Sequence, residues 1–161
     1  MIKIAHRALR YGPDPALENR PEEIEKCLYM GYDVEIDVWH DGASGWWLGH
    51  DTPVYPVSKS FLERPGLWLH CKNAHAASHA TDAMHFFWHQ TDDYTITNRG
   101  IIWVYPGQPV VAGSVWVLPE KHCEIGKIDS RAKKEKIYAV CTDYLNGMYP
   151  VASGVNGRYW T

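Results

Sequence analysis

The alternating stretch Val34-Glu35-Ile36-Asp37-Val38 is the feature that most constrains the fold of this chain. Alternate residues of a β-strand point to opposite faces, so Glu35 and Asp37 share one face and the aliphatic residues share the other. Two adjacent carboxylates repel each other, and water, a proton or a divalent cation must relieve that repulsion. Taken alone, the pattern is more typical of a half-buried strand with a solvated acidic face than of a site.

The length and net charge of the chain limit the number of its domains and the kinds of partner it can bind. Its 161 residues, 45% hydrophobic and 22% charged, suit a single domain over residues 1–161 with a packed core. The formal net charge is -3, and the sequence contains no run rich in Lys and Arg. Because a nucleic-acid-binding surface needs a basic patch to meet phosphates, we expect no nucleic-acid partner.

The N-terminus and the cysteines indicate the compartment. Residues 1–7 become polar too early for a signal peptide, and no apolar stretch is long enough for a transmembrane segment. Cys27, Cys71, Cys123 and Cys141 are widely spaced and form no CxxC pair, so neither a zinc site nor a disulfide framework is indicated. We therefore expect a cytoplasmic protein whose cysteines are reduced and mostly buried.

The first 38 residues predict a βαβ unit. Residues 3–7 read as a short strand, and an amphipathic helix is expected from Pro21, which fits a first helical position, to a stop near Gly31. A helical crossover makes the strands at 3–7 and 34–38 parallel. His6 then lies with Glu35 and Asp37 at the carboxyl end of the sheet, where ligands gather in parallel α/β folds.

Two later segments are expected to return to the same edge. Turn residues around 39–45 and a short run at 46–49 predict a hairpin-like excursion that brings back His50. Residues 67–72 predict a further strand, with His70 and Lys72 on its polar face near the carboxyl end.

The second half is rich in predicted strands and poor in helices. A short helix is expected within 74–84, and strands are expected at 86–89, 94–97, 101–105, 115–118 and 137–141. With the first three strands these make about eight, the number in a (β/α)8 barrel, although such barrels take about 250 residues. The fold class predicted is α/β, a TIM-barrel-like domain with helices shortened or missing in its C-terminal half. Barrel surface left without helices favours a homo-oligomer.

Four short motifs in series resemble the glycerophosphodiester phosphodiesterase family. These are His6-Arg7, Glu18-Asn19, Glu35-Ile36-Asp37-Val38 and His50-Asp51, each at a predicted strand end or loop. Farther on, 69–72 falls where the family has a Glu-x-Lys strand, and 141–144 looks like its closing Thr-Asp segment. The resemblance implies a TIM barrel of lipid metabolism that hydrolyses a small-molecule glycerophosphodiester with a divalent cation.

The resemblance also assigns the metal site. It implies that Glu35 and Asp37, with Glu18 and His70, bind the cation and polarise the phosphoryl group. The family is expected to use Mg²⁺ or Ca²⁺. His70 stands where the family has a glutamate, and imidazole prefers Mn²⁺ or Zn²⁺ to those harder ions. The other departure is Ala8, which replaces the glycine that follows the His-Arg pair.

Four more residues supply the remaining chemistry of phosphodiester cleavage. Arg7 and Lys72 would hold phosphate oxygens, Arg through its bidentate fork and Lys as a point charge. His6 and His50 would serve as the acid/base pair, and the sequence does not say which is the acid.

The site residues are compatible with three hypotheses about the function of the chain. The first is a phosphodiester hydrolase that yields an alcohol and a phosphomonoester. The second is a phospholipase-type lyase that releases a cyclic phosphate, and the third is a non-catalytic barrel that only binds phosphoesters.

Overall fold

The computed structural model describes residues 1–145, and residues 146–161 of the predicted domain lie outside this range. The protein is a mixed α/β fold with one ten-stranded sheet and few helices. Its strands are β1 (Ile2–His6), β2 (Asp33–His40), β3 (Trp46–Leu48), β4 (Tyr55–Val57), β5 (Leu67–Cys71), β6 (Phe86–Phe87), β7 (Tyr94–Ile96), β8 (Ile102–Val104), β9 (Val115–Val117) and β10 (Ala139–Thr142). Its α-helices are α1 (Pro21–Tyr29), α2 (Lys59–Leu62), α3 (Ala74–His79) and α4 (Ile128–Lys134), with 3-10 turns at Pro119–Lys121 and Ile125–Lys127.

The centre of the sheet is parallel. The strands pair side by side in the order β8-β9-β10-β1-β2-β5-β6, each parallel to its neighbours. The register aligns His6 with Glu35 across β1 and β2, and Asp37 with His70 across β2 and β5. This confirms the predicted parallel βαβ unit. It also places the polar ends of β1, β2 and β5 at one edge of the sheet.

Three strands are antiparallel additions. β3 pairs with the end of β2 and β4 pairs with β3, which confirms the predicted hairpin-like excursion. β7 pairs antiparallel with β8. Residues 1–145 therefore form ten strands rather than the eight expected, because the excursion contributes β3 and β4 to the sheet.

Helices cover only part of the outer face of the sheet. Helix α1 starts at Pro21 with Glu22 and Glu23 in its first turn, as predicted, and buries Ile24 and Cys27. Helix α3 is shorter than the expected 74–84 segment, because Ala80 leaves the helical conformation for an extended one. Helix α4 was not predicted from the sequence. It buries Ile128 and Ala132, which pack against the outer face of β9 and β10.

The two faces of the sheet have separate cores. Aliphatic side chains of β2 and β5, among them Ile36 and Leu69, pack under α1, α2 and α3. The inner face holds a second cluster that includes Ile4, Trp68 and Trp103. The inner cluster draws its side chains from β1, β5, β6, β8, β9 and β10, whereas β2 contributes Glu35 and Asp37 at the inner positions.

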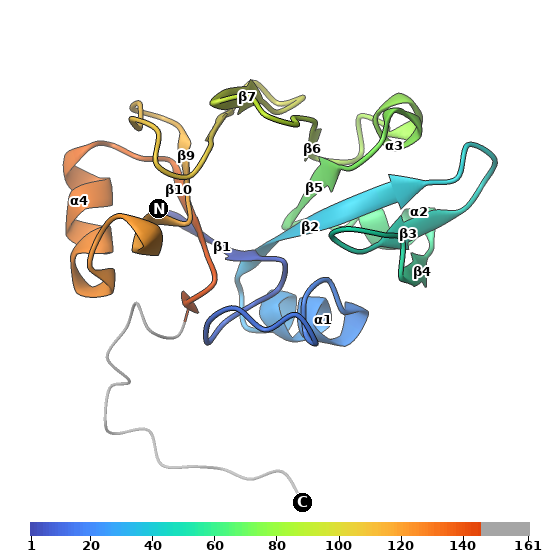
Figure 1. Cartoon of the computed structure of the whole chain (residues 1–161), viewed down its shortest axis with the longest axis horizontal. Coiled ribbons are helices and arrows are strands. Elements are labelled where there is room, and N and C mark those ends of the chain that lie inside the picture. Colours follow the sequence, from blue (N-terminus) through green and yellow to red (C-terminus); the bar gives the residue numbers. More distant parts are fainter. Residues whose placement is uncertain (146–161) are drawn as a thin grey trace, which may run out of the picture.

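The sheet curls until its two ends approach each other. Figure 1 shows the strands following an arc from β5 and β6 through β7 to β9 and β10. The rings of Phe87 on β6 and Trp103 on β8 stack at 4.4 Å. Asn98 also bonds to Phe86 twice, its backbone N–H donating to the Phe86 carbonyl at 2.9 Å and its Oδ1 accepting from the Phe86 N–H at 3.0 Å. No strand ladder joins β6 to β7 or β8 within residues 1–145.

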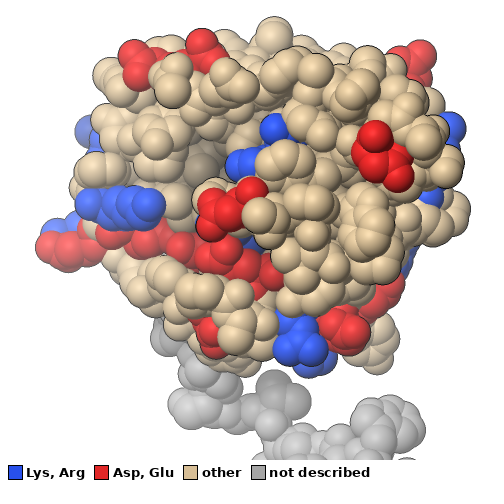
Figure 2. All heavy atoms as spheres, turned by 45° about the vertical axis from the view of Figure 1, so that its right-hand side comes forward, with Lys and Arg blue, Asp and Glu red and all other residues tan. Residues whose placement is uncertain are grey.

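Three further expectations concern the cysteines, membrane-spanning helices and surface charge. Cys27, Cys71 and Cys141 are buried, Cys123 is half-buried, and all are free thiols, as predicted. Within the described range, no helix has both the length and the apolar character needed to cross a bilayer. On the face drawn in Figure 2, basic side chains are scattered among acidic ones rather than gathered in one patch.

Candidate functional site

His6 ends β1 and is held between two acids. Its Nδ1 lies 2.7 Å from Asp143 Oδ1, so the carboxylate accepts the Nδ1 proton. Its Nε2 lies 3.9 Å from Glu35 Oε2. Burial lowers the pKa of His6, but the hydrogen bond to Asp143 and the charge of Glu35 outweigh burial, and the net pKa is raised. The protonated form of His6 is therefore favoured more than in a free imidazole.

The backbone turns at Arg7, and this residue contacts three carboxylates. Its φ is 51°, and its backbone N–H donates to Glu35 Oε2 at 3.1 Å. The guanidinium donates from Nη1 to Glu18 Oε2 at 3.1 Å, and its Nε lies 3.3 Å from Asp37 Oδ2. The turn therefore places the side chain of Arg7 next to the acids of β2.

The next residue, Ala8, stands where the glycerophosphodiester phosphodiesterases have glycine. Ala8 has φ 64° and its methyl group is buried. Replacing it with glycine relieves left-handed strain of about 1–2 kcal/mol, but loses about 0.8 kcal/mol of methyl burial and about 0.4–1 kcal/mol through the freer unfolded chain. We expect Ala8→Gly to change the free energy of unfolding by less than about 1 kcal/mol, since these opposing effects nearly cancel.

The measurement for Ala8→Gly is urea denaturation, with Ala132→Gly as the matched control. Ala132 is equally buried but lies inside α4, where glycine costs about 1 kcal/mol of helix propensity in addition to the methyl group. An Ala8→Gly variant destabilised as much as Ala132→Gly would show that the left-handed turn carries no strain.

Glu35 and Asp37 lie side by side on the inner face of β2, with exposures of 2% and 1%. Asn19 holds Asp37 in place, because its Nδ2 donates to Asp37 Oδ2 at 3.0 Å and its Oδ1 accepts from the Asp37 backbone N–H at 2.9 Å. Asn19 is fully buried and has φ 57°, a conformation that asparagine tolerates better than most residues. The acid pair is thus fixed by its strand and by one buried amide.

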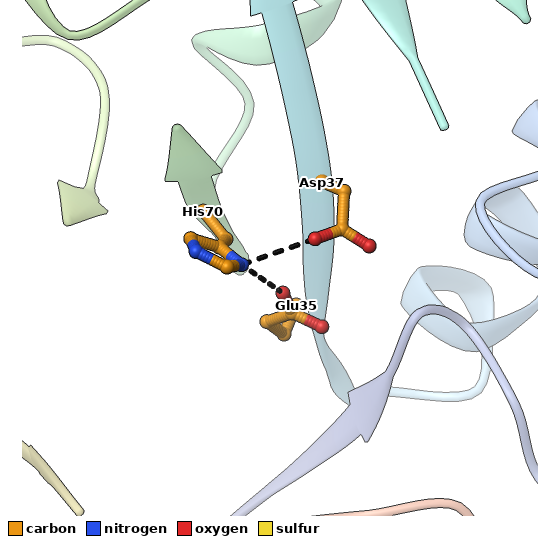
Figure 3. A group of neighbouring side chains, drawn as sticks. All are labelled: Glu35, Asp37 and His70. Atoms are coloured by element: carbon orange, nitrogen blue, oxygen red, sulfur yellow. Dashed lines mark hydrogen bonds and ion pairs between the residues drawn. The ribbon is translucent and has the colours of Figure 1, made fainter. Parts of the chain in front are cut away.

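The neighbouring strand β5 and the residue that follows it bring two basic side chains to the same carboxylates. His70 Nδ1 lies 3.0 Å from Asp37 Oδ1 and 4.0 Å from Glu35 Oε1, as Figure 3 shows. Lys72 Nζ lies 3.3 Å from Asp37 Oδ1. The prediction that Glu35, Asp37, His70 and Lys72 point into one cavity is confirmed.

The hydrogen bond of His70 Nε2 determines which protonation states are open to His70 Nδ1. Nε2 lies 3.3 Å from the carbonyl oxygen of His89, which can only accept, so Nε2 carries a proton. In the neutral ring, Nδ1 then presents a lone pair to Glu35 and Asp37, and two carboxylates facing a lone pair need a cation or a proton between them. A histidine that binds a metal through one nitrogen usually donates its other N–H to a carbonyl or carboxylate in this way.

The two acids respond to this environment in opposite directions. Burial raises the pKa of Glu35, and the adjacent charge of Asp37 raises it further. Burial also acts to raise the pKa of Asp37, but the hydrogen bond with His70 and the charge of Lys72 hold it well below its usual range. Asp37 therefore has Arg7 and Lys72 at 3.3 Å, whereas the ion pairs of Glu35 are longer, at 3.9 Å and 4.0 Å.

His50 approaches the site from the loop after β3. Its side chain is 35% exposed, and its Nδ1 lies 2.7 Å from Oδ1 of the solvent-exposed Asp51. His50 lines the same cavity as His6 and the acids. It is thus more open to solvent than His6, whose side chain is 13% exposed.

These side chains surround a cavity of about 250 Å³. One wall is polar and carries His6, Arg7, His70 and Lys72. The remaining wall is formed by a mixture of aromatic, apolar and polar residues, namely His89, Gln90, Trp103, Tyr105, Pro106, Val117, Leu118 and Lys121. The cavity has room for a small polar molecule.

The structure brings together seven of the eight predicted site residues as cavity lining, and Glu18 is the exception. Three ligand atoms, one each from Glu35, Asp37 and His70, lie within 4.8 Å of one another, and within residues 1–145 no other such group forms. The carboxylate of Glu18 accepts from Arg7 instead of joining this group.

Sequence reasoning does not assign Asn19, His89 or Asp143 to the site. Asn19 carries the second letter of the Glu-Asn motif, and Asp143 lies in the segment that resembles the family's closing Thr-Asp pair. Both signals were present, but the role of each depends on a contact with a distant residue. His89 has no motif and acts through its backbone carbonyl.

The protonation of His6 gives a prediction that does not involve turnover. In chelator-treated protein, we expect His6 to titrate above its ordinary value of 6.5 and Asp143→Asn to lower that pKa, because the amide removes the partner's charge. A pKa raised on folding means that the pair stabilises the protein fully below the unfolded pKa and that this stability is lost as pH rises through the folded pKa. NMR titration of the histidine rings measures the shift.

Asp51→Asn is the control for this titration, since Asp51 contacts His50 rather than His6. An unchanged His6 pKa in Asp143→Asn would contradict the assignment.

No family model, no curated protein and no solved structure matches the chain.

Proposed function

We propose that the chain is a metal-dependent phosphodiester hydrolase that resembles the glycerophosphodiester phosphodiesterases. The observation that carries the proposal is the convergence in one cavity of two acids and the basic side chains that face them, from the ends of β1, β2 and β5 and the loop after β3, namely Glu35, Asp37, His6, His50, Arg7 and Lys72. Phosphodiester cleavage needs neutralised phosphate oxygens, a deprotonated nucleophile and a protonated leaving group, and the cavity offers a side chain for each need. The substrate class proposed is a small glycerophosphodiester, cleaved to an alcohol and a phosphomonoester.

We further propose that the sheet forms a (β/α)8-like barrel with a reduced outer layer. The stacking of Phe87 on Trp103 and the hydrogen bonds between Asn98 and Phe86 support closure between β6 and the β7–β8 hairpin. The site would then occupy the carboxyl-end mouth, where barrel enzymes hold their catalytic residues.

Glu35, Asp37 and His70 fit a divalent cation. Their donor set is two carboxylate oxygens and one imidazole nitrogen, and the ion pairs of Glu35 are long. The Nε2–H of His70 already donates to a carbonyl. This set suits Mn²⁺ or Zn²⁺, whereas the resemblance favours Mg²⁺ or Ca²⁺. A cation bound there would polarise the phosphoryl group and lower the pKa of a bound hydroxyl.

Arg7 and Lys72 would bind the phosphate. Each lies 3.3 Å from Asp37, so both positive groups stand at the acid pair and line the cavity. The guanidinium, fixed by Glu18, would donate to two phosphate oxygens, and the ammonium would add a point charge.

His6 and His50 would divide the proton transfers. The raised pKa of His6 and its orientation by Asp143 suit a general acid that protonates the leaving oxygen. His50, open to solvent, would then accept the proton of the attacking hydroxyl.

The test is an assay of bis(4-nitrophenyl) phosphate and of glycerophosphodiesters after chelation and after return of Mg²⁺, Ca²⁺, Mn²⁺ or Zn²⁺. The proposal expects turnover that chelation removes and one or more of these ions restores. Product analysis separates a hydrolase from a lyase, since only the lyase ends at a cyclic phosphate. Absence of turnover with every ion would reject the hydrolase.

A second candidate is a protein that binds phosphoesters without cleaving them. It is favoured by the short distance from His70 to Asp37, because an imidazolium there, with Arg7 and Lys72, would balance the acids without any ion. Saturable binding of a glycerophosphodiester without turnover would select this candidate.

The uncovered side of the β7–β8 hairpin supports a homo-oligomer. Tyr94, Ile96 and Ile102 are exposed by 42%, 62% and 36%, and Val111 lies beside them. Apolar surfaces of this kind are usually buried by association. We expect light scattering to show more than one subunit at micromolar protein, and Ile96→Lys to shift the protein towards a monomer. A monomeric wild-type protein would contradict this prediction.

A further inference from the structure

A second cavity, of about 310 Å³, opens at the opposite end of the parallel strands from the candidate active site. Its lining includes Ile2, Asp33 and Leu67, which begin β1, β2 and β5, and Tyr138, which directly precedes β10. The residues of the candidate active site lie at the carboxyl ends of the same strands. The two cavities are therefore separate, and the second has the size of a small ligand pocket.

An aromatic pair forms part of the wall of this second cavity. The rings of Trp68 and His85 lie 3.9 Å apart, and the exposed ring of Tyr138 lies 6.4 Å from Trp68. Trp68 Nε1 donates to Asp33 Oδ2 at 2.8 Å. Aromatic rings at a cavity wall offer a flat surface on which a ligand ring can pack.

His85 is a buried polar group without a partner. The residue is only 6% exposed, and its Nε2 has no hydrogen-bond partner in the part of the chain that the structure describes. Burial, with the charge of Arg99, lowers the pKa of His85 to about 4, so the ring is neutral. Buried polar atoms are nearly always hydrogen-bonded, and an unpaired one beside a cavity points to a bound molecule.

Two charged groups flank the aromatic pair. The charge of Arg99 contributes to the lowered pKa of His85, and Asp33 accepts the hydrogen bond from Trp68. Arg99 makes no ion pair within residues 1–145, whereas Arg64, the other arginine of this lining, binds Glu25 through both of its terminal nitrogens. The second oxygen of Asp33 likewise accepts no hydrogen bond from the described residues.

We propose that this cavity binds a small aromatic carboxylate whose ring carries an O–H or N–H donor. The carboxylate would pair with Arg99 and the ring would pack on the aromatic wall. The ring donor would bond to Asp33, and a ring hydroxyl would also accept a hydrogen bond from the Nε2–H of His85, which otherwise has no partner. Glu63 also lines the cavity, but Lys59 and Thr81 already contact its carboxylate, so Arg99 is the charged group that a ligand's carboxylate would meet. A wholly apolar ligand would leave the buried Nε2 of His85 without a partner.

The experiment is calorimetric titration of the full chain with 4-hydroxybenzoate. We expect saturable binding with a Kd of about 1 mM or tighter. Arg99→Gln should weaken it about tenfold or more, because a charge-assisted hydrogen bond is lost. Arg99 is exposed, so its replacement leaves the fold intact. Lys134→Gln makes the same change of charge on the exposed side of α4, and we expect it to leave binding unchanged.

A third variant separates the two cavities. Lys121 is exposed and lines the candidate active site, which also offers positive charge to a carboxylate. If Lys121→Gln weakens binding and Arg99→Gln does not, the compound occupies the candidate active site and the proposal fails. It fails equally if the wild-type protein shows no saturable binding, or if Lys134→Gln weakens binding as much as Arg99→Gln.

Discussion

Replacing either His6 or His50 with alanine is expected to abolish measurable phosphodiester turnover while the protein stays folded. A positioned acid or base contributes about 10²- to 10⁴-fold to the rate, and the two histidines would act on opposite sides of the same phosphate. His50 is partly exposed and makes one contact, to Asp51, so its loss should cost little stability. The measurements are kcat on an aryl phosphodiester and thermal unfolding of each variant.

His6 needs a second variant, because its removal leaves Asp143 buried without its partner. His6→Gln keeps an N–H donor for Asp143 but cannot transfer a proton, so it should be inactive and close to wild type in stability. His75→Ala is the matched control, since His75 is exposed on α3 and does not line the cavity. Wild-type rates in both alanine variants would reject the acid/base assignment.

The parts of the site that the sequence predicts are those fixed by strand periodicity. Alternation alone puts Glu35 with Asp37, and His70 with Lys72, on the inner faces of their strands. The crossover through α1 makes β1 and β2 parallel, which brings His6 to the same edge. These inferences use only local pattern and chirality, and the structure agrees with each of them.

The parts that the sequence does not predict depend on contacts between distant segments. In the sequence, Asn19 is only a loop residue and Asp143 only an acid after a strand. Their roles come from the contacts of Asn19 with Asp37 and of Asp143 with His6. The pairing of Glu18 with Arg7 is decided in the same way, by the left-handed turn at Arg7 and Ala8. Spacing along the chain cannot specify such partners.

The outer layer was hard to predict for a different reason. Helix α4 is only seven residues long, and its buried stripe consists of Ile128 and Ala132. The β4 strand carries Pro56 at its centre, which argues against a strand, yet it pairs through β3 as an edge strand where proline is tolerated. Short elements of this kind are set by the sheet they pack against.

The largest effect on the metal site is expected from His70→Glu, which introduces the residue that glycerophosphodiester phosphodiesterases have in the segment that 69–72 resembles. In the natural protein, His70 packs beside the rings of Phe87 and His89, with ring separations of 5.1 Å and 4.7 Å, and faces two carboxylates. A glutamate there would place a third carboxylate beside Glu35 and Asp37. We expect the metal-free variant to be less stable than the natural protein, since like charges repel at a buried site.

The same change should move the ion preference from Mn²⁺ or Zn²⁺ towards Mg²⁺ or Ca²⁺, because an all-oxygen donor set suits harder ions. Ion binding to the folded state adds about 2.7 kcal/mol at one hundred times Kd, so thermal unfolding with each ion ranks the preference independently of activity. His70→Gln is the control that removes the imidazole without adding charge, and we expect it to bind every ion more weakly.

Calorimetry decides between the two roles of His70. If the natural protein binds Mn²⁺ or Zn²⁺ and the His70→Glu variant binds Mg²⁺ or Ca²⁺, then His70 acts as a ligand through Nδ1, with Nε2 held by the carbonyl of His89. If the natural protein binds no divalent ion and the His70→Glu variant does, then an imidazolium occupies the place of the cation. In that case Arg7, Lys72 and His70 together balance the acids, and the metal-dependent mechanism is wrong for this chain.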